Sequence, residues 1–379
     1  MTQEVVKSSR AGSDEAVKEL VSQLKKPLSE YKAVLFFASS SYEFAEMSVQ
    51  IKQNFPNAEV IGTSTSGEIS NYGFAKNSVV LTALTCTKTQ FAGFILHDVD
   101  KYPITQKNSI LDAARKCGIM LESTESHKNS FAITFVNGLC NAEEALLSLL
   151  YAFIKDDKFI VAGGSAGDDL KFKQTFVSYN GETVSNGAVV LFVKTYGSFD
   201  IRKENIFTPS GKLINITQAD TYSRKIISLD GVNPKKRYAE ALGLTESAIS
   251  DAVLSHPFGR VFGGKMFISS IAGFNNDGTI NMYSRVLPNS TVELLNPLVP
   301  EEIAKKTSES ILQEIPKPDC VIVINCILRT IMFEQQNKTN LLLSNFKRTF
   351  PVFCGFSSYG EQIGKINSNQ TLVTIAIGE

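Results

Sequence analysis

Residues 60–70, VIGTSTSGEIS, begin as an apolar strand and change abruptly into a turn of hydroxyls, two glycines and one acidic residue. Two distant stretches, VAGGSAGDDL at 161–170 and FCGFSSYGEQI at 353–363, have the same order. Each has an apolar strand, a Gly, any residue, a Ser, a short gap, a second Gly, and then Asp or Glu. Three copies of one strand-to-turn motif predict a fold built from a repeated unit.

The same elements surround each copy of this motif. A short apolar run and an amphipathic helix precede it, and a Val-rich strand follows it. The apolar runs are 33–39, 131–138 and 320–326, and the later strands are 77–84, 186–193 and 369–377. Such runs are typical of parallel strands buried on both faces and joined by right-handed crossovers. We therefore predict an α/β fold, mixed with α+β features, of repeated strand-helix-strand-loop-strand units that form mixed sheets flanked by helices.

Helix and turn signals divide the chain into two packed domains. Residues 1–29 hold an N-terminal helix, which Ser13 begins and Pro27 stops, and it leads into a domain of two units over 30–225. Asn141 and Glu144 form the pattern of a capping box for a helix in the second unit. Residues 196–300 do not fit the repeat, and Asn276-Asp277-Gly278 marks a hairpin there. We therefore predict a second domain over 226–379, completed by the third unit.

Composition excludes several classes of protein. Lys plus Arg and Asp plus Glu both number 38, so no net positive charge favours nucleic acid. No apolar run approaches the length of a membrane helix, and the N-terminus lacks the pattern of a signal peptide. The six cysteines include no Cys-x-x-Cys pair and lie mostly in apolar segments, as reduced buried thiols do. We therefore expect a cytoplasmic protein without a membrane or nucleic-acid partner.

The motifs predict a polar binding site at the carboxyl ends of the strands. Loops diverge there, glycine allows backbone N–H groups to converge on an anion, and serine adds hydroxyl groups. Arg329 follows the third apolar run, and its planar guanidinium suits a carboxylate. The candidate ligand-binding residues are Ser64, Ser66, Gly67, Glu68, Gly164, Ser165, Asp168, Arg329, Ser357, Gly360 and Glu361.

Other interpretations of these residues stay open. The serines and acids of such turns often bind their own backbone, and Arg329 could form a structural bridge to Glu361 or Asp168. GGSAG at 163–167 matches a hydrolase nucleophile elbow, but a hairpin rather than a helix is expected after it. The three histidines have no zinc spacing, and no Gly-rich phosphate loop is present. We therefore expect a protein that is not an enzyme.

Together these motifs resemble the FIST sensory domain family over roughly residues 30–379. VIGTSTSGEIS and VAGGSAGDDLKFKQTFVSYNG resemble its N-terminal part, and RYAEALGL, INCILR and FCGFSSYGEQIG resemble its C-terminal part. The glycines, Asp168, Arg329, Gly360 and Glu361 stand where the family's pattern has them. Ile327-Leu328 depart from it, because the family often has a small residue there.

The resemblance implies a signal-input protein that binds a small, amino-acid-like ligand. The signal would pass to a separate partner such as a histidine kinase or a cyclase. Some stand-alone members are haem proteins that sense nitric oxide and regulate a histidine kinase, which makes haem a possible cofactor. Haem iron needs an axial ligand, and His256, in a loop beside Pro257, is our candidate. A scaffold without a ligand and a homo-oligomer are further hypotheses.

Overall fold

The computed structural model describes residues 1–262, 264–338 and 341–379. Three copies of one unit form the body of the molecule. Each unit consists, in chain order, of an edge strand, a helix, the apolar strand, one or two further helices, the motif strand, a hairpin and a closing strand. The first unit comprises β1 (Thr2–Ser8), α1 (Ser13–Gln23), β2 (Ala33–Ser39), α2 (Phe44–Asn54), β3 (Glu59–Thr65), β4 (Glu68–Ser70), β5 (Gly73–Ala75) and β6 (Val79–Thr85). The second comprises β7 (Thr89–His97), α3 (Lys107–Lys116), β8 (Ser130–Val136), α4 (Glu143–Phe153), β9 (Val161–Ser165), β10 (Val177–Tyr179), β11 (Glu182–Val184) and β12 (Gly187–Thr195). The third comprises β13 (Ser198–Asn205), α6 (Pro300–Glu314), β21 (Cys320–Cys326), α7 (Ile327–Gln335), α8 (Leu341–Thr349), β22 (Cys354–Ser358), β23 (Glu361–Ile363), β24 (Ile366–Ser368) and β25 (Thr371–Gly378).

Each unit forms most of one mixed six-stranded sheet. The apolar strand and the motif strand pair in parallel (β2 with β3, β8 with β9, β21 with β22), and the closing strand lies antiparallel beside the apolar strand. The edge strand then pairs with the closing strand. The described residues form four sheets and eight α-helices in all. The predicted mixed α/β fold of repeated units is confirmed.

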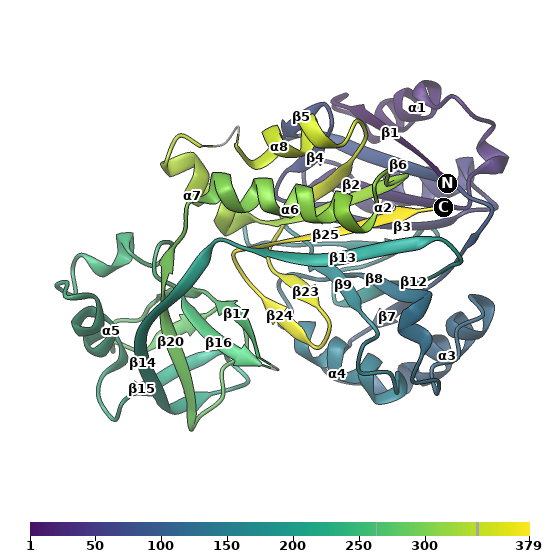
Figure 1. The fold of residues 1–379 in the computed structure, drawn as a ribbon. Coiled ribbons are helices and arrows are strands. Elements are labelled where there is room, and N and C mark those ends of the chain that lie inside the picture. The colour runs from purple at the N-terminus through teal and green to yellow at the C-terminus, as the bar shows by residue number, and fades with distance from the viewer. Residues whose placement is uncertain (263, 339–340) are drawn as a thin grey trace.

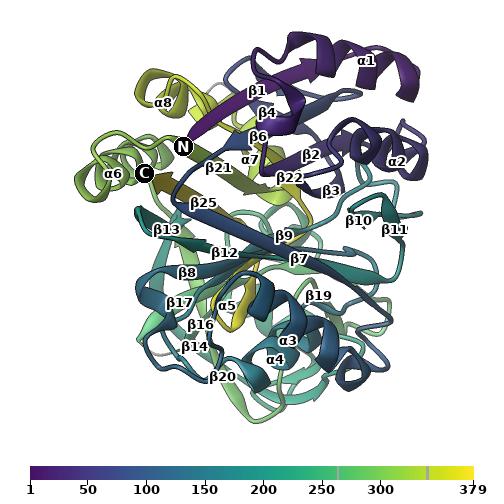
Figure 2. The ribbon, with the colours of Figure 1, turned by 90° about the vertical axis from the view of Figure 1, so that its right-hand side faces the viewer.

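The hairpin after each motif joins the sheet of a different unit. Strand β10 pairs with β3, β23 pairs with β9, and β4 pairs with β22, all antiparallel. Every unit therefore donates one hairpin and receives another, so the three sheets are linked in a closed ring. Figure 2 shows one of these exchanges, with β10 and β11 of the second unit beside β3 of the first.

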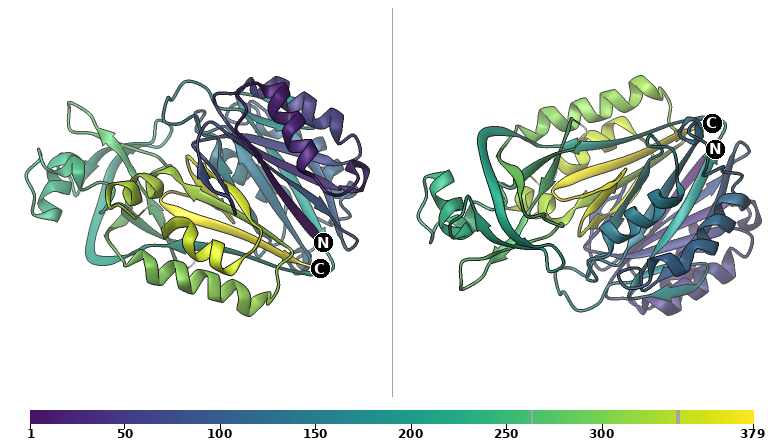
Figure 3. Two further views of the ribbon diagram at one scale, coloured as in Figure 1. Left: turned by 90° about the horizontal axis from the view of Figure 1, so that it is seen from above. Right: turned by 90° about the horizontal axis from the view of Figure 1, so that it is seen from below.

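The three sheets share one apolar core, and the helices lie outside it. The rings of Phe37, Phe135 and Phe356 meet at the centre, with centroids 5.2–5.9 Å apart. Helices α1 and α2 cover one sheet, α3 and α4 the second, and α6 to α8 the third, each over its own apolar cluster (Figure 3). Since both faces of the central strands are covered, their apolar runs are continuous rather than alternating.

A seven-stranded sheet is inserted between β13 and α6 and projects from one side of the body (Figure 1). The inserted segment comprises, in chain order, β14 (Phe207–Asp220), β15 (Lys225–Leu229), α5 (Pro234–Leu242), β16 (Phe258–Phe262), β17 (Lys265–Ser269), β18 (Ile271–Phe274), β19 (Ile280–Met282) and β20 (Ser290–Pro297). Strands β18 and β19 form the hairpin that Asn276-Asp277-Gly278 predicts. The expected domain boundary at 225/226 lies at the start of β15, inside this inserted sheet.

Short 3₁₀ turns and a contact between the termini complete the chain. The turns are Leu28–Glu30, Pro103–Gln106, Ser126–Lys128 and Ile249–Asp251. The Met1 ammonium lies 2.8 Å from the Glu379 carboxylate, so the two ends meet beside β25. Among the described residues, no helix has both the length and the apolar character needed to cross a membrane.

Candidate functional site

The three motif turns, at 64–68, 164–168 and 357–361, converge at one place that we call the hub. The Ser66 N–H donates to the Ser357 carbonyl at 3.0 Å, and the Ser165 N–H donates to the Gly360 carbonyl at 2.8 Å. The Gly167 N–H donates to the Ser64 carbonyl at 3.0 Å. Ser64, Ser66, Ser165 and Ser357 are fully buried. The turns therefore face one another, and their backbone groups bind the neighbouring turn.

Glu68 and Glu361 occupy equivalent places in the hub. Each stands at the start of a donated hairpin, opposite Phe356 and Gly164 respectively. Glu361 accepts from the Ser358 hydroxyl at 2.6 Å and from the Thr371 hydroxyl at 2.7 Å. Thr65 and Ser78 bind Glu68 in the same way, at 2.5 and 2.6 Å. Burial raises the pKa of both carboxyls to about 7. These carboxyls hold the hairpins to the closing strands.

Asp168 organises the long loop between β9 and β10. Its carboxylate accepts from the N–H groups of Phe172, Lys173 and Gln174 at 2.7–3.1 Å and from the Tyr359 hydroxyl. Burial opposes its ionisation, but these donors outweigh that effect and lower the pKa of Asp168. The loop is strained, because Asp169, Leu170 and Phe172 have positive φ.

Glycine at two hub positions is explained by close packing. Gly67 has a φ of +134°, and a Cβ there would lie 2.4 Å from the Phe74 ring. A Cβ at Gly164 would lie 2.5 Å from Ile324. At Gly360 a Cβ would instead meet polar atoms of Asn367 and Asn369, at 3.3 and 3.4 Å.

Arg329 lies outside the hub, on the helix-covered side of its sheet. Its side chain is 2% exposed, and Nη2 donates to Glu204 of β13 at 2.5 Å. Nε donates to Asn325 at 3.1 Å, and the Phe333 ring lies 5.3 Å away. The structural bridge considered from the sequence therefore exists, with Glu204 rather than Glu361 or Asp168 as the partner.

A buried ion cluster connects the hub with the inserted sheet. The Ser165 hydroxyl donates to Glu143 at 2.9 Å, and Arg224 donates to Glu143 and Glu144, each at 2.6 Å. Burial opposes ionisation of Glu144, but Arg224 and the Arg285 N–H lower its pKa. The capping box expected from Asn141 and Glu144 is absent, because α4 begins at Glu143 and Glu144 faces Arg224.

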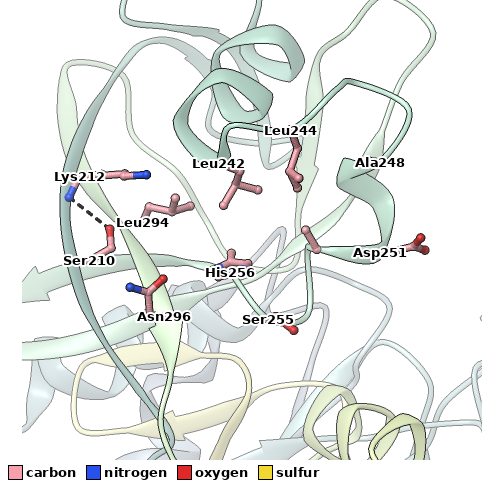
Figure 4. Close-up of a pocket in the computed structure, with 11 residues that line it drawn as sticks. Ser210, Lys212, Leu242, Leu244, Ala248, Asp251, Ser255, His256, Leu294 and Asn296 are labelled. Carbon is pink, nitrogen blue, oxygen red and sulfur yellow. Dashed lines mark hydrogen bonds between the residues drawn. The ribbon is translucent and has the colours of Figure 1, made fainter.

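His256 lines a pocket of about 490 Å³ beside β14 and β20 of the inserted sheet (Figure 4). Its Nδ1 lies 3.0 Å from the Leu295 carbonyl oxygen. A carbonyl only accepts, so Nδ1 is the donor, and in the tautomer that carries its proton there the lone pair lies on Nε2. Leu242, Leu244 and Leu294 form the apolar part of the wall, and polar side chains such as Lys212 form the rest.

A larger cavity, of about 910 Å³, lies at the junction of the inserted sheet and the body. We call it the seam cavity, and its lining comes from residues 157–160, β13, β17 and the turn 363–366 of the β23–β24 hairpin. None of the candidate motif residues lines it, nor does Arg329. Sequence reasoning missed this cavity because lysines and apolar residues in ordinary strands carry no local signal.

The arrangement defines a two-part protein in which an inserted sheet and a threefold body together line a cavity of ligand size. Residues 32–232 match the FIST N domain, and residues 235–364 match the FIST C domain. The chain therefore belongs to the FIST family, a family of sensory domains, and has a signal-input role.

Two further similarities add little about function. MJ1623 of Methanocaldococcus jannaschii, described as uncharacterized, is 22% identical over 361 residues. That match covers 83% of this chain and 66% of the relative. A solved structure titled "Cyanuric acid hydrolase: evolutionary innovation by structural concatenation" covers 100% of this chain and 99% of its own, with 8% identity. Its TM-score of 0.37 is too low to support an argument about fold or activity.

Proposed function

We propose that the chain is a non-enzymatic cytoplasmic sensor that binds a small polar ligand in the seam cavity. Its signal would pass to a separate protein, such as a histidine kinase or a cyclase. The observation that carries the proposal is the position of the cavity between two parts of the chain. Ligand sites occur preferentially at such junctions, and a cavity of this size accommodates a metabolite.

The seam position also suggests how a ligand would act. A molecule in the cavity would touch β17 of the inserted sheet and the β23–β24 hairpin of the body together. The base of that hairpin holds Gln362, which donates to Ser165 in the hub at 3.1 Å. Binding would therefore favour one arrangement of the inserted sheet on the hub, and a partner would respond to that population shift.

Filling the cavity tests this proposal. Ile366 lines the cavity, so Ile366→Trp should remove bound ligand, whereas Ile227→Trp, at an exposed position on β15, should not. Small molecules released from the denatured wild type and both variants are compared by mass spectrometry. Loss from Ile366→Trp alone supports the proposal. Equal retention in both variants, or a wild type that carries nothing and acts only as a scaffold, contradicts it.

A haem-based nitric oxide sensor is a second candidate, favoured by the hydrogen bond that His256 Nδ1 donates to the Leu295 carbonyl. A histidine that ligates a metal usually donates its other ring N–H to a carbonyl, as His256 does to Leu295. His256 would supply the axial nitrogen ligand of the haem iron, and Leu242, Leu244 and Leu294 would contact the porphyrin. Haem would supply an iron that binds a diatomic gas.

Visible spectra test the haem hypothesis. Protein purified after growth with added haem precursor should show a Soret band. His256→Ala should abolish the band, and His97→Ala, on an exposed strand end, should leave it unchanged. A colourless wild type, or a band that persists in His256→Ala, would exclude this role for His256.

A further inference from the structure

We infer that the seam cavity recognises an organic acid, with its polar carboxylate on Lys203 and an apolar body between the inserted sheet and the hairpin turn. This inference names the class of ligand and rests on the proposed function. It differs from the amino-acid-like ligand that the family resemblance implies, because the cavity favours a negative charge and disfavours a positive one.

Cations outnumber acids around the cavity. Its lining includes Lys158, Arg202, Lys203, Lys265 and Lys365, and the acidic lining residue is Asp157. Two of the cations have acidic partners: Arg202 binds Asp200 at 2.5 Å, and Lys365 binds Asp157 at 2.6 Å. Among the described residues, the other three lysines have no carboxylate within salt-bridge distance. An anionic ligand would neutralise this excess charge.

Lys203 is positioned to hold the anion. It extends from β13, and its ammonium donates to the Met266 carbonyl and lies 3.7 Å from the centroid of the Phe267 ring. These contacts fix the ammonium and leave N–H groups for a ligand, since an ammonium has three donors. Burial and the neighbouring Lys265 lower the pKa of Lys203 to about 8. A carboxylate beside this group would favour its charged form.

Much of the remaining wall is apolar. Ile160 and Ile201 line the cavity on the body side, Met266 and Phe267 on the inserted sheet, and Ile363 and Ile366 on the hairpin. A ligand with an aromatic ring or a branched alkyl group would cover this surface, at about 25 cal/mol per Å² of apolar area buried.

An α-ammonium group would lack a suitable partner in the cavity. The Asp157 side chain is 88% exposed and already binds Lys365. The ammonium of an amino acid would also approach Lys203 and Lys265, and like charges in a partly buried site repel. The cavity should therefore distinguish an organic acid from the amino acid of the same shape.

Matched ligand pairs test this inference by calorimetry at pH 7. Phenylpyruvate should bind at least tenfold more tightly than phenylalanine, and phenylacetate more tightly than its neutral amide, phenylacetamide. Lys203→Met should weaken phenylpyruvate binding at least tenfold. Lys265→Glu should also weaken phenylpyruvate binding. Because Lys265 is exposed, this variant should fold normally, so it tests the charge requirement even if Lys203→Met misfolds. Lys306→Met, on the exposed face of α6, is the matched control.

The outcomes separate this inference from the proposed function. Equal affinity for acid and amide, or unchanged affinity in both Lys203→Met and Lys265→Glu, overturns the ligand class. If none of these acids binds while the molecule released from wild type is lost from Ile366→Trp, the class fails and the sensor proposal stands. If Ile366→Trp keeps that molecule, the cavity assignment itself fails.

Discussion

Glu68 and Glu361 should make the protein less stable as pH rises from about 5 to 7. Their folded-state pKa values, about 7, lie above the ordinary value of 4.5. In this range the folded chain binds more protons than the unfolded chain, so stability falls as pH rises. Each group contributes a slope of at most about 1.4 kcal/mol per pH unit. Thermal unfolding at pH 5, 6 and 7 measures the effect.

Replacement of these carboxyls by amides identifies the groups responsible. Glu361→Gln should flatten part of the pH dependence, and the double variant with Glu68→Gln should flatten more. Each carboxyl also has an electrostatic interaction with a neighbouring titratable group: Glu361 with Cys326, and Glu68 with Asp169. Glu246→Gln, at an exposed position, is the control. An unchanged slope in the double variant would contradict the assignment.

Removing one partner of the Arg329–Glu204 pair should destabilise the fold strongly. Arg329→Met leaves the Glu204 carboxylate buried without a counter-charge, which costs about 3–5 kcal/mol. Glu204→Gln in the same chain should restore much of that loss, as urea unfolding would show. The double variant should keep the molecule that wild type carries, because neither residue lines the seam cavity. Loss of that molecule would instead give Arg329 a ligand role.

At the level of single residues, the sequence predicts types of interaction better than partners. Repeated Gly and Ser correctly place three polar turns at strand ends, because that pattern is local. The partner of Arg329 is 125 residues away in the sequence, and no local pattern identifies it. Lys203 gives no signal either, because its environment is created by β17 of the inserted sheet.

Among the elements, α4 depends on the inserted segment for the positive charge that neutralises the two carboxylates of its first turn. Glu143 and Glu144 lie at the helix N-terminus, where negative charge is favourable, and both bind Arg224. Arg224→Met leaves two buried carboxylates and should cost about 3 kcal/mol or more. It should also speed proteolysis between the body and the inserted sheet. Arg237→Met, at a partly exposed pair with Asp230, should cost less than 1 kcal/mol.

Element boundaries and types follow from the sequence where the signal is local. Continuous apolar runs predict β2, β8 and β21 within one or two residues, and Asn-Gly or Asp-Gly pairs mark the β10–β11 and β18–β19 hairpins. The sheet that each hairpin joins is not predictable in this way. A turn fixes the pairing within its hairpin, whereas pairing with another unit depends on the packing of all three sheets.

For the whole molecule, hairpin exchange should make the body one cooperative unit. A fragment of residues 1–197 lacks β22 and β23, the partners of β4 and β9. It also loses the third face of the central core, including Phe356. We expect this fragment to lack fixed tertiary structure by near-ultraviolet circular dichroism, while the full chain shows a sharp transition. A fragment with a sharp transition of its own would show that the units fold independently.

Ligand binding should couple the two sides of the seam cavity. A ligand that bridges β17 and the 363–366 turn should slow hydrogen exchange in both, although they belong to different sheets. At one hundred times its dissociation constant it adds about 2.7 kcal/mol of stability. Slowing should extend along the hairpin to Gln362 and Asn367, because these side chains join Ser165 and Glu144. Ile366→Trp protein should show no such change. Protection confined to β17 would mean that the cavity binds a molecule without coupling the inserted sheet to the hub.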